Sequence, residues 1–223
     1  MLHLITDRRR LAGTTDLQRV RDCLFSQARF AAAAGVDVIQ IRERDLDARI
    51  LMGIVGDALR AAEGTASRVI VNDRVDVALA SGAHGVHLPA RSLPVAAVRA
   101  ISPRGFVIGR SVHNAAELED AAGADYVIAG TVWATVSKPE AGGELLGAAG
   151  LAALVTLAPM PVIAIGGVDR SRFRDVAGSG AAGAASIGLF LDTGSRAQVC
   201  RAVDVCDVVA AARRAFDTPG SGS

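Results

Sequence analysis

The chain has 223 residues, of which 51% are hydrophobic and 4% aromatic, enough to bury a large core in one α/β domain or two small ones. Its 24 basic and 23 acidic residues give a formal net charge of +1, and no basic run is interleaved with aromatic residues. This composition argues against a nucleic-acid partner.

The two ends of the chain carry no membrane signal. The N-terminal stretch MLHLITDRRR is too short and too charged for a signal peptide, and no apolar run is long enough to span a bilayer. We therefore expect a cytoplasmic protein with no membrane partner and a disordered tail at residues 218–223. The three cysteines match no zinc motif and are expected to serve packing (Cys23, Cys200, Cys206).

Four segments of the chain resemble one another. They are AAAAGVDVIQIR from Ala31, ASGAHGVHL from Ala80, AAGADYVIAG from Ala121 and GSGAAGAASIG from Gly178. Each reads as a helix end, a glycine suited to a left-handed helix stop, a short link and an apolar strand. Their spacing fits two βα units per interval.

Further apolar runs complete a regular alternation of strands and helices. The remaining strands are expected at Leu2–Ile5, Val69–Val71, Phe106–Ile108 and Val162–Ile165. Helices are expected at Gln18–Ala34, Leu46–Glu63, Asp76–Ser81, Pro94–Ala100, Ala115–Ala122, Leu145–Ala158, Arg170–Ala177 and Arg196–Ala215. Eight such units predict a (β/α)₈ TIM barrel over residues 1–217. A doubly wound sheet is the alternative, but ITDRRRLAG lacks the usual phosphate loop after its first strand.

Active sites of such barrels lie at the carboxyl ends of the strands. In QIRER, Gln40 and Arg42 share one face of the second strand, which is costly inside a barrel unless they meet a ligand or ion partner. Arg44, just past the strand, can equally be a site residue or a solvated loop residue. In VNDRVD, Asn72 and Asp73 can hold a metal or orient a substrate, or Asp73 can cap the next helix.

The fourth and fifth strands carry two candidate histidines. A lone histidine in a strand is more often a core residue with its hydrogen bonds made than a catalyst, and we expect this of His87 in GVHL. In VIGRSVHN, Ser111 and His113 are expected to be a substrate-facing catalytic pair, while Arg110 is expected to pair with a carboxylate or an anion.

The last three strand ends suggest substrate and phosphate contacts. Hydroxyls and one cation in the long loop GTVWATVSKPEAGGE are candidates for substrate binding, with a plain solvated loop as the alternative (Thr131, Thr135, Ser137, Lys138). Glycine-rich turns after the seventh and eighth strands predict a phosphate site, with tight turns alone as the alternative (Gly166, Gly167, Ser186, Ile187, Gly188).

As a set, these motifs resemble the thiamine phosphate synthase / TenI superfamily from Leu2 to about Phe190. The resemblance is carried by LITD, IQIRER, VNDRVDVAL, GVHL, GADYV, the threonine and lysine loop, and PVIAIGGV. It implies a (β/α)₈ enzyme acting on a small-molecule thiazole phosphate, whose phosphate lies on the glycine loops after strands seven and eight.

The synthase branch of that superfamily joins pyrimidine methyl pyrophosphate to thiazole phosphate, releases pyrophosphate and needs Mg²⁺. The resemblance implies that two aspartates hold the ion. Asp73 matches the first, but Ser92 stands at the second, and Arg44 replaces a family lysine. Loss of one anionic ligand should leave Asp73 as a weak metal ligand, relevant only to a synthase.

The tautomerase branch requires no cofactor and moves a proton to aromatise a thiazole carboxylate phosphate. The resemblance in IRER, in the LP…S segment and in IGRSVH makes His113 its acid/base, a role that suits an imidazole near neutral pH. A TenI-type thiazole tautomerase is therefore the main expectation. A synthase with an altered metal site is the first alternative, and a non-catalytic binding or regulatory protein of the same pathway is the second. A homo-oligomer is compatible with the sequence.

Overall fold

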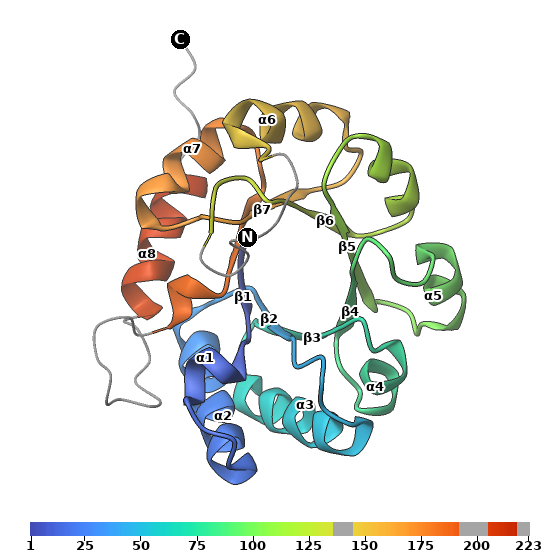
Figure 1. Cartoon of the computed structure of the whole chain (residues 1–223), viewed down its shortest axis with the longest axis vertical. Helices are drawn as coiled ribbons and strands as arrows, with labels where there is room; N and C mark the ends of the chain where they lie inside the picture. The colour runs from blue at the N-terminus through green and yellow to red at the C-terminus, as the bar shows by residue number, and fades with distance from the viewer. Residues whose placement is uncertain (136–144, 192–204, 218–223) are drawn as a thin grey trace.

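The computed structural model describes residues 1–135, 145–191 and 205–217, and eight parallel strands close into a barrel in it (Figure 1). Each strand pairs with its neighbour in chain order, and β8 pairs with β1. The strands are β1 (Leu2–Ile5), β2 (Val38–Ile41), β3 (Arg68–Asn72), β4 (Gly85–Leu88), β5 (Val107–Val112), β6 (Tyr126–Ala129), β7 (Val162–Ile165) and β8 (Gly183–Ser186). The predicted (β/α)₈ barrel is confirmed.

Helices surround the barrel on the outside (Figure 1). The α-helices are α1 (Arg8–Ala12), α2 (Leu17–Ala34), α3 (Ala48–Ala62), α4 (Val75–Ala80), α5 (Val95–Ile101), α6 (Gly147–Leu157), α7 (Phe173–Gly178) and α8 (Val205–Phe216). Short 3₁₀ helices form η1 (Ala116–Ala121), η2 (Arg170–Arg172) and η3 (Gly188–Phe190).

The structure differs from the sequence expectations in several elements. Helix α1 was not expected, and the expected helix at Ala115–Ala122 is the 3₁₀ helix η1. The fifth strand continues to Val112, past its expected end at Ile108. Residues 192–204, which include the start of the expected last helix, and the expected tail at 218–223 lie outside the described part of the chain.

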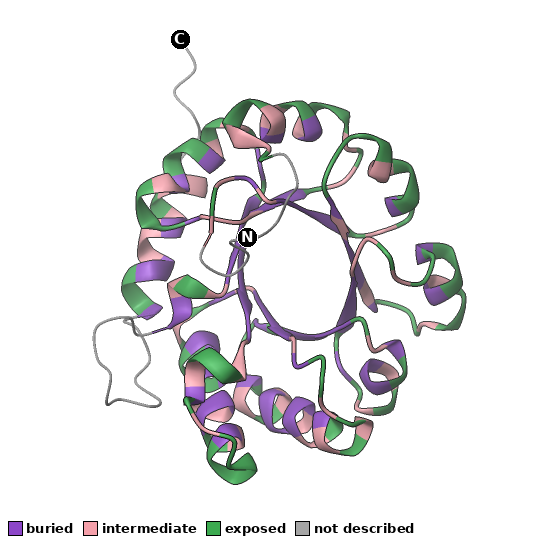
Figure 2. Ribbon diagram, viewed as in Figure 1, coloured by how far each residue is buried: buried purple, intermediate pink, exposed green. Residues whose placement is uncertain are grey.

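Two layers of apolar side chains hold the barrel together. The larger layer packs strand residues such as Leu4 and Ile41 against the helices. The smaller layer contains only strand residues among its buried members, such as Ile5, Val38 and Ile163, and these alternate along the strands with the first set. Alternation places this second set inside the barrel, so most strand residues are buried whichever way they point, and the strands are largely purple in Figure 2.

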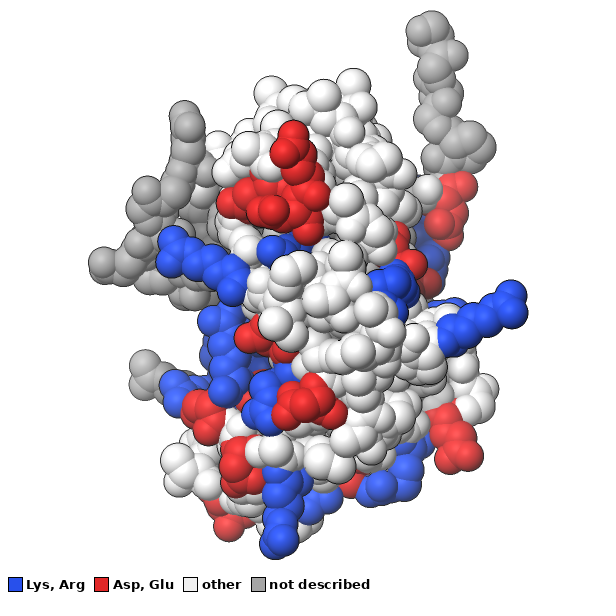
Figure 3. All heavy atoms as spheres, turned by 90° about the vertical axis from the view of Figure 1, so that its right-hand side faces the viewer, with Lys and Arg blue, Asp and Glu red and all other residues white. Residues whose placement is uncertain are grey.

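The surface and the cysteines give few further constraints. On the face shown in Figure 3, acidic side chains gather in one patch near the top, whereas basic and acidic side chains lie mixed in the lower half. Within the described ranges, no helix combines the length and apolar character needed to cross a membrane.

The cysteines differ in their state. Cys206 is free and exposed, whereas Cys23 is buried and disulfide-bonded, so packing is not the whole role of Cys23.

Candidate active site

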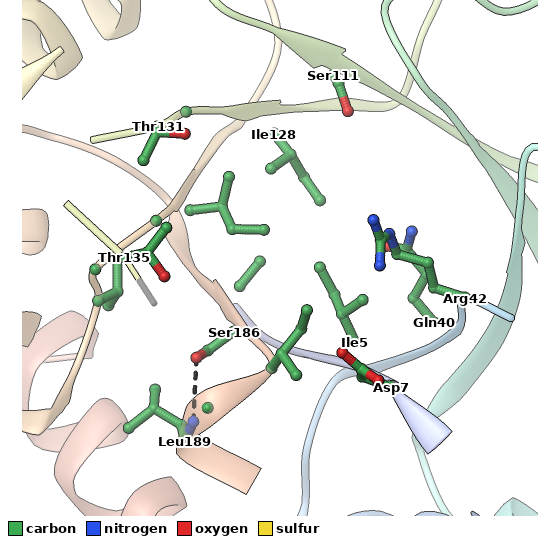
Figure 4. Close-up of a pocket in the computed structure, with 18 of the residues that line it drawn as sticks. Ile5, Asp7, Gln40, Arg42, Ser111, Ile128, Thr131, Thr135, Ser186 and Leu189 are labelled. Carbon is green, nitrogen blue, oxygen red and sulfur yellow. Dashed lines mark hydrogen bonds between the residues drawn. The ribbon is translucent and has the colours of Figure 1, made fainter. Parts of the chain in front are cut away.

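A cavity of about 700 Å³ opens at the carboxyl ends of the strands. Gln40 and Arg42 extend into it from one side, and Thr131, Thr135 and Ser186 lie on the opposite side (Figure 4). The cavity lining includes most of the predicted site residues: Gln40, Arg42, Asn72, Ser111, His113, Thr131, Thr135, Gly166, Gly167, Ser186, Ile187 and Gly188. Ser137 and Lys138 lie outside the described residues.

The glycine side of the cavity is built from two loops that approach closely. Gly166 and Gly167 have φ angles of 97° and 63°, in the left-handed region. A Cβ on Gly167 would lie 2.6 Å from the carbonyl oxygen of Ala134, so the turn also needs glycine for packing. A Cβ on Gly188 would meet nothing within 4 Å, and Gly188 lies directly on the cavity. The backbone N–H of Leu189 donates to Ser186 Oγ at 3.2 Å (Figure 4).

The opposite side of the cavity carries unpaired positive charge. The Arg42 guanidinium makes no hydrogen bond or ion pair with the described residues, and Arg44 lines the cavity next to it. Burial, and then repulsion from Arg44, lower the pKa of Arg42. Asp7 also lines the cavity and acts in the opposite direction on that pKa, but forms no ion pair with Arg42. Like charges that converge in a cavity indicate an anionic ligand.

A pair of amides lies between these two sides. Gln40 is 1% exposed, and its Nε2 donates to Asn72 Oδ1 at 3.0 Å. Gln40 Oε1 and Asn72 Nδ2 are buried and have no hydrogen-bond partner among the described residues. The pair thus keeps one acceptor and one donor for another group. Because unpaired buried polar atoms are costly, these two atoms are suited to pair with a ligand.

His87 is a cavity residue that the sequence argument favoured as core. Its Nε2 lies 2.8 Å from Ser111 Oγ, and its Nδ1 lies 3.3 Å from the Tyr126 hydroxyl. Burial, with help from the nearby His3, lowers the pKa of His87 to about 3. Gly109 makes room for this arrangement, because a Cβ there would lie 2.2 Å from Tyr126 Cζ. The available signal was the position of His87 at the end of a barrel strand.

The polar side chains at the carboxyl end of β5 point in two directions: His113 lines the cavity, whereas Arg110 points away from the barrel. His113 lines the cavity but is half-exposed, and both its backbone N–H and its Nδ1 lie within 2.9 Å of Glu117 Oε2. Arg110 was expected to pair with a carboxylate or an anion, and the described residues give it no carboxylate partner. Its guanidinium donates to the carbonyls of Leu93 and Ala90, because β5 still alternates at residue 110 and directs that side chain out of the barrel.

The residues present fit a protein-held Mg²⁺ poorly. Asp73 is exposed, is not part of the cavity lining and accepts a hydrogen bond from the Ser92 hydroxyl. It does not cap α4, which has no side-chain cap. The described residues contain no cluster of three acidic, histidine or cysteine side chains suited to a metal. A single carboxylate with one oxygen already engaged is a weak start for a hard-cation site.

Several polar residues near the cavity were missed by sequence reasoning. Asp7 and Arg10 line it, while Thr6, Arg8 and Glu43 form a hydrogen-bonded group behind Arg42. The polar residues that follow β1 in LITDRRR were a usable signal, since they stand at a strand end like the other site residues.

Comparison with known proteins identifies the family. The sequence matches the thiamine monophosphate synthase family over residues 2–190. A thiamine-phosphate synthase of Methanoculleus marisnigri is 41% identical over 188 residues, covering 83% of this chain and 88% of the relative. A thiamine-phosphate synthase of Methanoregula boonei is 42% identical, covering 83% of this chain and 81% of the relative.

Among solved structures, a thiamine phosphate pyrophosphorylase from Pyrococcus furiosus superimposes with a TM-score of 0.75 and 29% identity. The match covers 97% of this chain and 95% of that protein. The family match spans the whole barrel and every described loop that lines the cavity. The chain belongs to the thiamine monophosphate synthase family.

Proposed function

We propose that the protein is a thiamine-phosphate synthase, a transferase that joins pyrimidine methyl pyrophosphate to thiazole phosphate and releases pyrophosphate. The observation that carries this proposal is one cavity with anion-accepting groups at two places. Arg42 lies opposite Thr131 and Ser186 (Figure 4). Gly166 lies against Thr131, and Arg44 also lines the cavity. Two phosphorylated substrates need two such places. The names of the similar proteins also favour the synthase, the first alternative from the sequence, over the tautomerase.

The thiazole phosphate is assigned to the glycine side. Gly166, Gly167 and Gly188 line the cavity, so their backbone groups can approach a phosphate. At Gly188 the Cβ position is open, so the absence of a side chain there leaves the backbone accessible. The hydroxyls of Thr131 and Ser186 lie on the same side of the cavity and can add hydrogen bonds (Figure 4).

The pyrophosphate is assigned to the arginine side. Negative charge builds up on pyrophosphate as its bond to the pyrimidine methylene carbon breaks and the new bond to the thiazole nitrogen forms. Fixed guanidinium groups stabilise such charge most effectively when no internal carboxylate competes for them. Arg42 meets this condition, since it forms no ion pair with the described residues.

The pyrimidine ring is assigned to the polar groups between the two sides. The free N–H of Asn72 Nδ2 can donate to a ring nitrogen, and Gln40 Oε1 can accept from a ring substituent. Burial keeps His87 neutral at physiological pH, so it acts in this proposal as a hydrogen-bond partner of Ser111 rather than as a proton carrier.

One observation supports a second function, the TenI-type tautomerase. His113 lines the cavity with Nδ1 directed at Glu117, an arrangement that suits an acid/base imidazole. In this second candidate His113 moves the proton and Ser111 contacts the substrate.

The test is to incubate the purified protein with both synthase substrates in the presence of Mg²⁺ and to quantify thiamine phosphate and pyrophosphate. The same preparation is offered the thiazole carboxylate phosphate tautomer alone. The synthase proposal expects stoichiometric release of both products with kcat on the order of 1–10³ s⁻¹. Rapid turnover of the tautomer with no coupling of the two synthase substrates would replace it with the second candidate.

A further inference from the structure

A buried group of three residues lies directly behind Arg42. The side chain of Glu43 is 2% exposed, yet its carboxylate accepts three hydrogen bonds. Thr6 Oγ1 donates to Glu43 Oε1 at 2.8 Å, the Arg8 backbone N–H donates to the same oxygen at 3.1 Å, and the Arg8 guanidinium donates to Oε2 at 3.1 Å. We call Thr6, Arg8 and Glu43 the β1–β2 brace.

The brace continues the β1–β2 pairing through a side chain. The last backbone rung runs from Thr6 N–H to the carbonyl of Gln40 at 3.0 Å. At the next position the Arg42 backbone N–H donates to Thr6 Oγ1 at 2.9 Å. The hydroxyl of Thr6 therefore accepts from Arg42 and donates to Glu43, which fixes the backbone from which the Arg42 side chain enters the cavity.

The brace also decides which cation Glu43 neutralises. Alternation along the chain directs Gln40 and Arg42 into the barrel and places Glu43 on the other side. There Arg8 holds the carboxylate, while Asp45 accepts two further hydrogen bonds from the same guanidinium at 2.6 and 2.7 Å. The carboxylate closest in sequence to Arg42 is thus paired elsewhere.

We infer that Thr6, Arg8 and Glu43 are positioning residues for anion binding: they fix the Arg42 backbone and keep its guanidinium unpaired for the pyrophosphate group of the substrate. This inference rests on the proposed function for the identity of the anion. None of the three residues lines the cavity, so the effect on the ligand passes through Arg42.

Inorganic pyrophosphate, titrated calorimetrically into the full chain, is the probe. Thr6→Val removes the hydroxyl while it keeps the shape of the side chain. It should raise the Kd roughly tenfold, the effect expected when a displaced Arg42 loses one hydrogen bond to the charged pyrophosphate. Thr6→Ser restores the hydroxyl and should bring the Kd back to the wild-type value. Unchanged affinity in Thr6→Val, or a loss of the same size in Thr6→Ser, would overturn the inference.

A double-mutant cycle on Arg8 and Glu43 tests the second part of the inference, that the brace keeps the Arg42 guanidinium unpaired. Arg8→Met leaves Glu43 as an unpaired carboxylate beside Arg42 and should weaken pyrophosphate binding about tenfold. Adding Glu43→Gln removes the competing charge, so the double variant should bind more tightly than Arg8→Met alone. If the two substitutions weaken binding independently, the brace is only structural and the inference fails.

The matched control is Asp37→Asn, at the other end of β2. Asp37 also braces β1 to β2, since it accepts from the Leu2 N–H at 2.6 Å and from Arg213 at 2.8 Å. This variant should lower the melting temperature without a change in the pyrophosphate Kd. A loss of affinity equal to that of Thr6→Val would show that general loosening, rather than positioning of Arg42, explains the result.

The outcomes separate this inference from the proposed function. If the wild type couples both substrates but Thr6→Val binds pyrophosphate normally, the inference fails and the synthase stands. If the wild type binds pyrophosphate in a Thr6-dependent manner but couples no substrates, the synthase fails and the brace stands. A wild type that does not bind pyrophosphate at all would overturn the inference.

Discussion

His87 and Ser111, 24 residues apart in the sequence, both line the cavity and form a hydrogen bond of 2.8 Å between Nε2 and Oγ. The other ring nitrogen of His87 lies 3.3 Å from the Tyr126 hydroxyl. The imidazole is therefore held on both sides by neutral groups, and burial lowers its pKa to about 3. A histidine held in this way orients a hydroxyl and does not exchange protons near neutral pH.

This relationship predicts the effect of Ser111→Ala. The variant leaves His87 Nε2 without its partner and removes the hydroxyl from the cavity. We expect kcat/KM to fall roughly tenfold and the free energy of unfolding to fall by about 1 kcal/mol. The pH–rate profile between about pH 5 and 8 should have the same shape in the wild type and in His87→Gln. A titration in that range that disappears in His87→Gln would contradict the neutral role.

His113→Gln distinguishes the two candidate functions. His113 is half-exposed and bonded to Glu117, so a synthase should lose less than about tenfold in turnover when it is replaced. A tautomerase that relies on its imidazole should lose about 10²–10⁴-fold. Turnover of each substrate set is measured beside the melting temperature, and a loss of synthase turnover in the second range would assign His113 a catalytic role there.

Gly188→Ala tests the phosphate position. Gly188 has room for a Cβ in the protein itself, but this Cβ would stand at the cavity wall. The variant should fold normally and bind thiazole phosphate roughly tenfold more weakly, because the methyl group keeps the phosphate from the backbone. Gly178→Ala is the matched control, since a Cβ there also meets nothing within 4 Å and the residue lies on α7 away from the cavity. Equal affinities of the two variants for thiazole phosphate would show that the phosphate does not bind at this turn.

Ser92→Asp tests the metal site. The wild type should bind Mn²⁺ or Mg²⁺ weakly in the absence of substrate, because Asp73 already accepts a hydrogen bond from Ser92 and position 92 supplies no second carboxylate. A second carboxylate should strengthen the binding of the free ion by about tenfold or more, measured by calorimetry. Tight binding by the wild type, unchanged in Asp73→Asn, would place the metal elsewhere.

The two histidines inside the barrel predict acid sensitivity. Burial lowers the pKa of both His3 and His87 to about 3, below the unfolded value of 6.5. The unfolded chain then binds more protons than the folded chain below about pH 6.5, so stability is present above that pH and is lost as the pH falls toward about 3. Each group should remove about 2 kcal/mol of unfolding free energy between about pH 7 and pH 5.

The measurement is urea unfolding of the wild type and His3→Phe at both pH values. Whatever its absolute stability, His3→Phe should lose about 2 kcal/mol less than the wild type over this interval. Burial raises the pKa of Glu43 and gives a contribution of opposite sign, but this contribution is common to both proteins and cancels in the comparison. Identical pH dependence in the two proteins would contradict the assignment.

The sequence by itself determined the barrel and most of its rim. Strand periodicity and the glycines that stop helices are local signals, and barrel closure brings every strand end to the same opening. Gln40, Arg42, Asn72 and the glycine turns could therefore be assigned to one site before any contact was known.

Only the tertiary structure decided how the side chains pair. Arg110 points out of the barrel because β5 continues to Val112, and its carbonyl partners Ala90 and Leu93 lie in a different loop. His87 contacts the cavity residue Ser111, although the two lie on different strands. Glu43 pairs with Arg8, which follows β1, and not with Arg42, its neighbour in the sequence. Local sequence indicates which segments form strands, but the tertiary structure decided where β5 ends. The partner of a buried polar group is likewise determined by strand register and by the high cost of leaving that group unpaired.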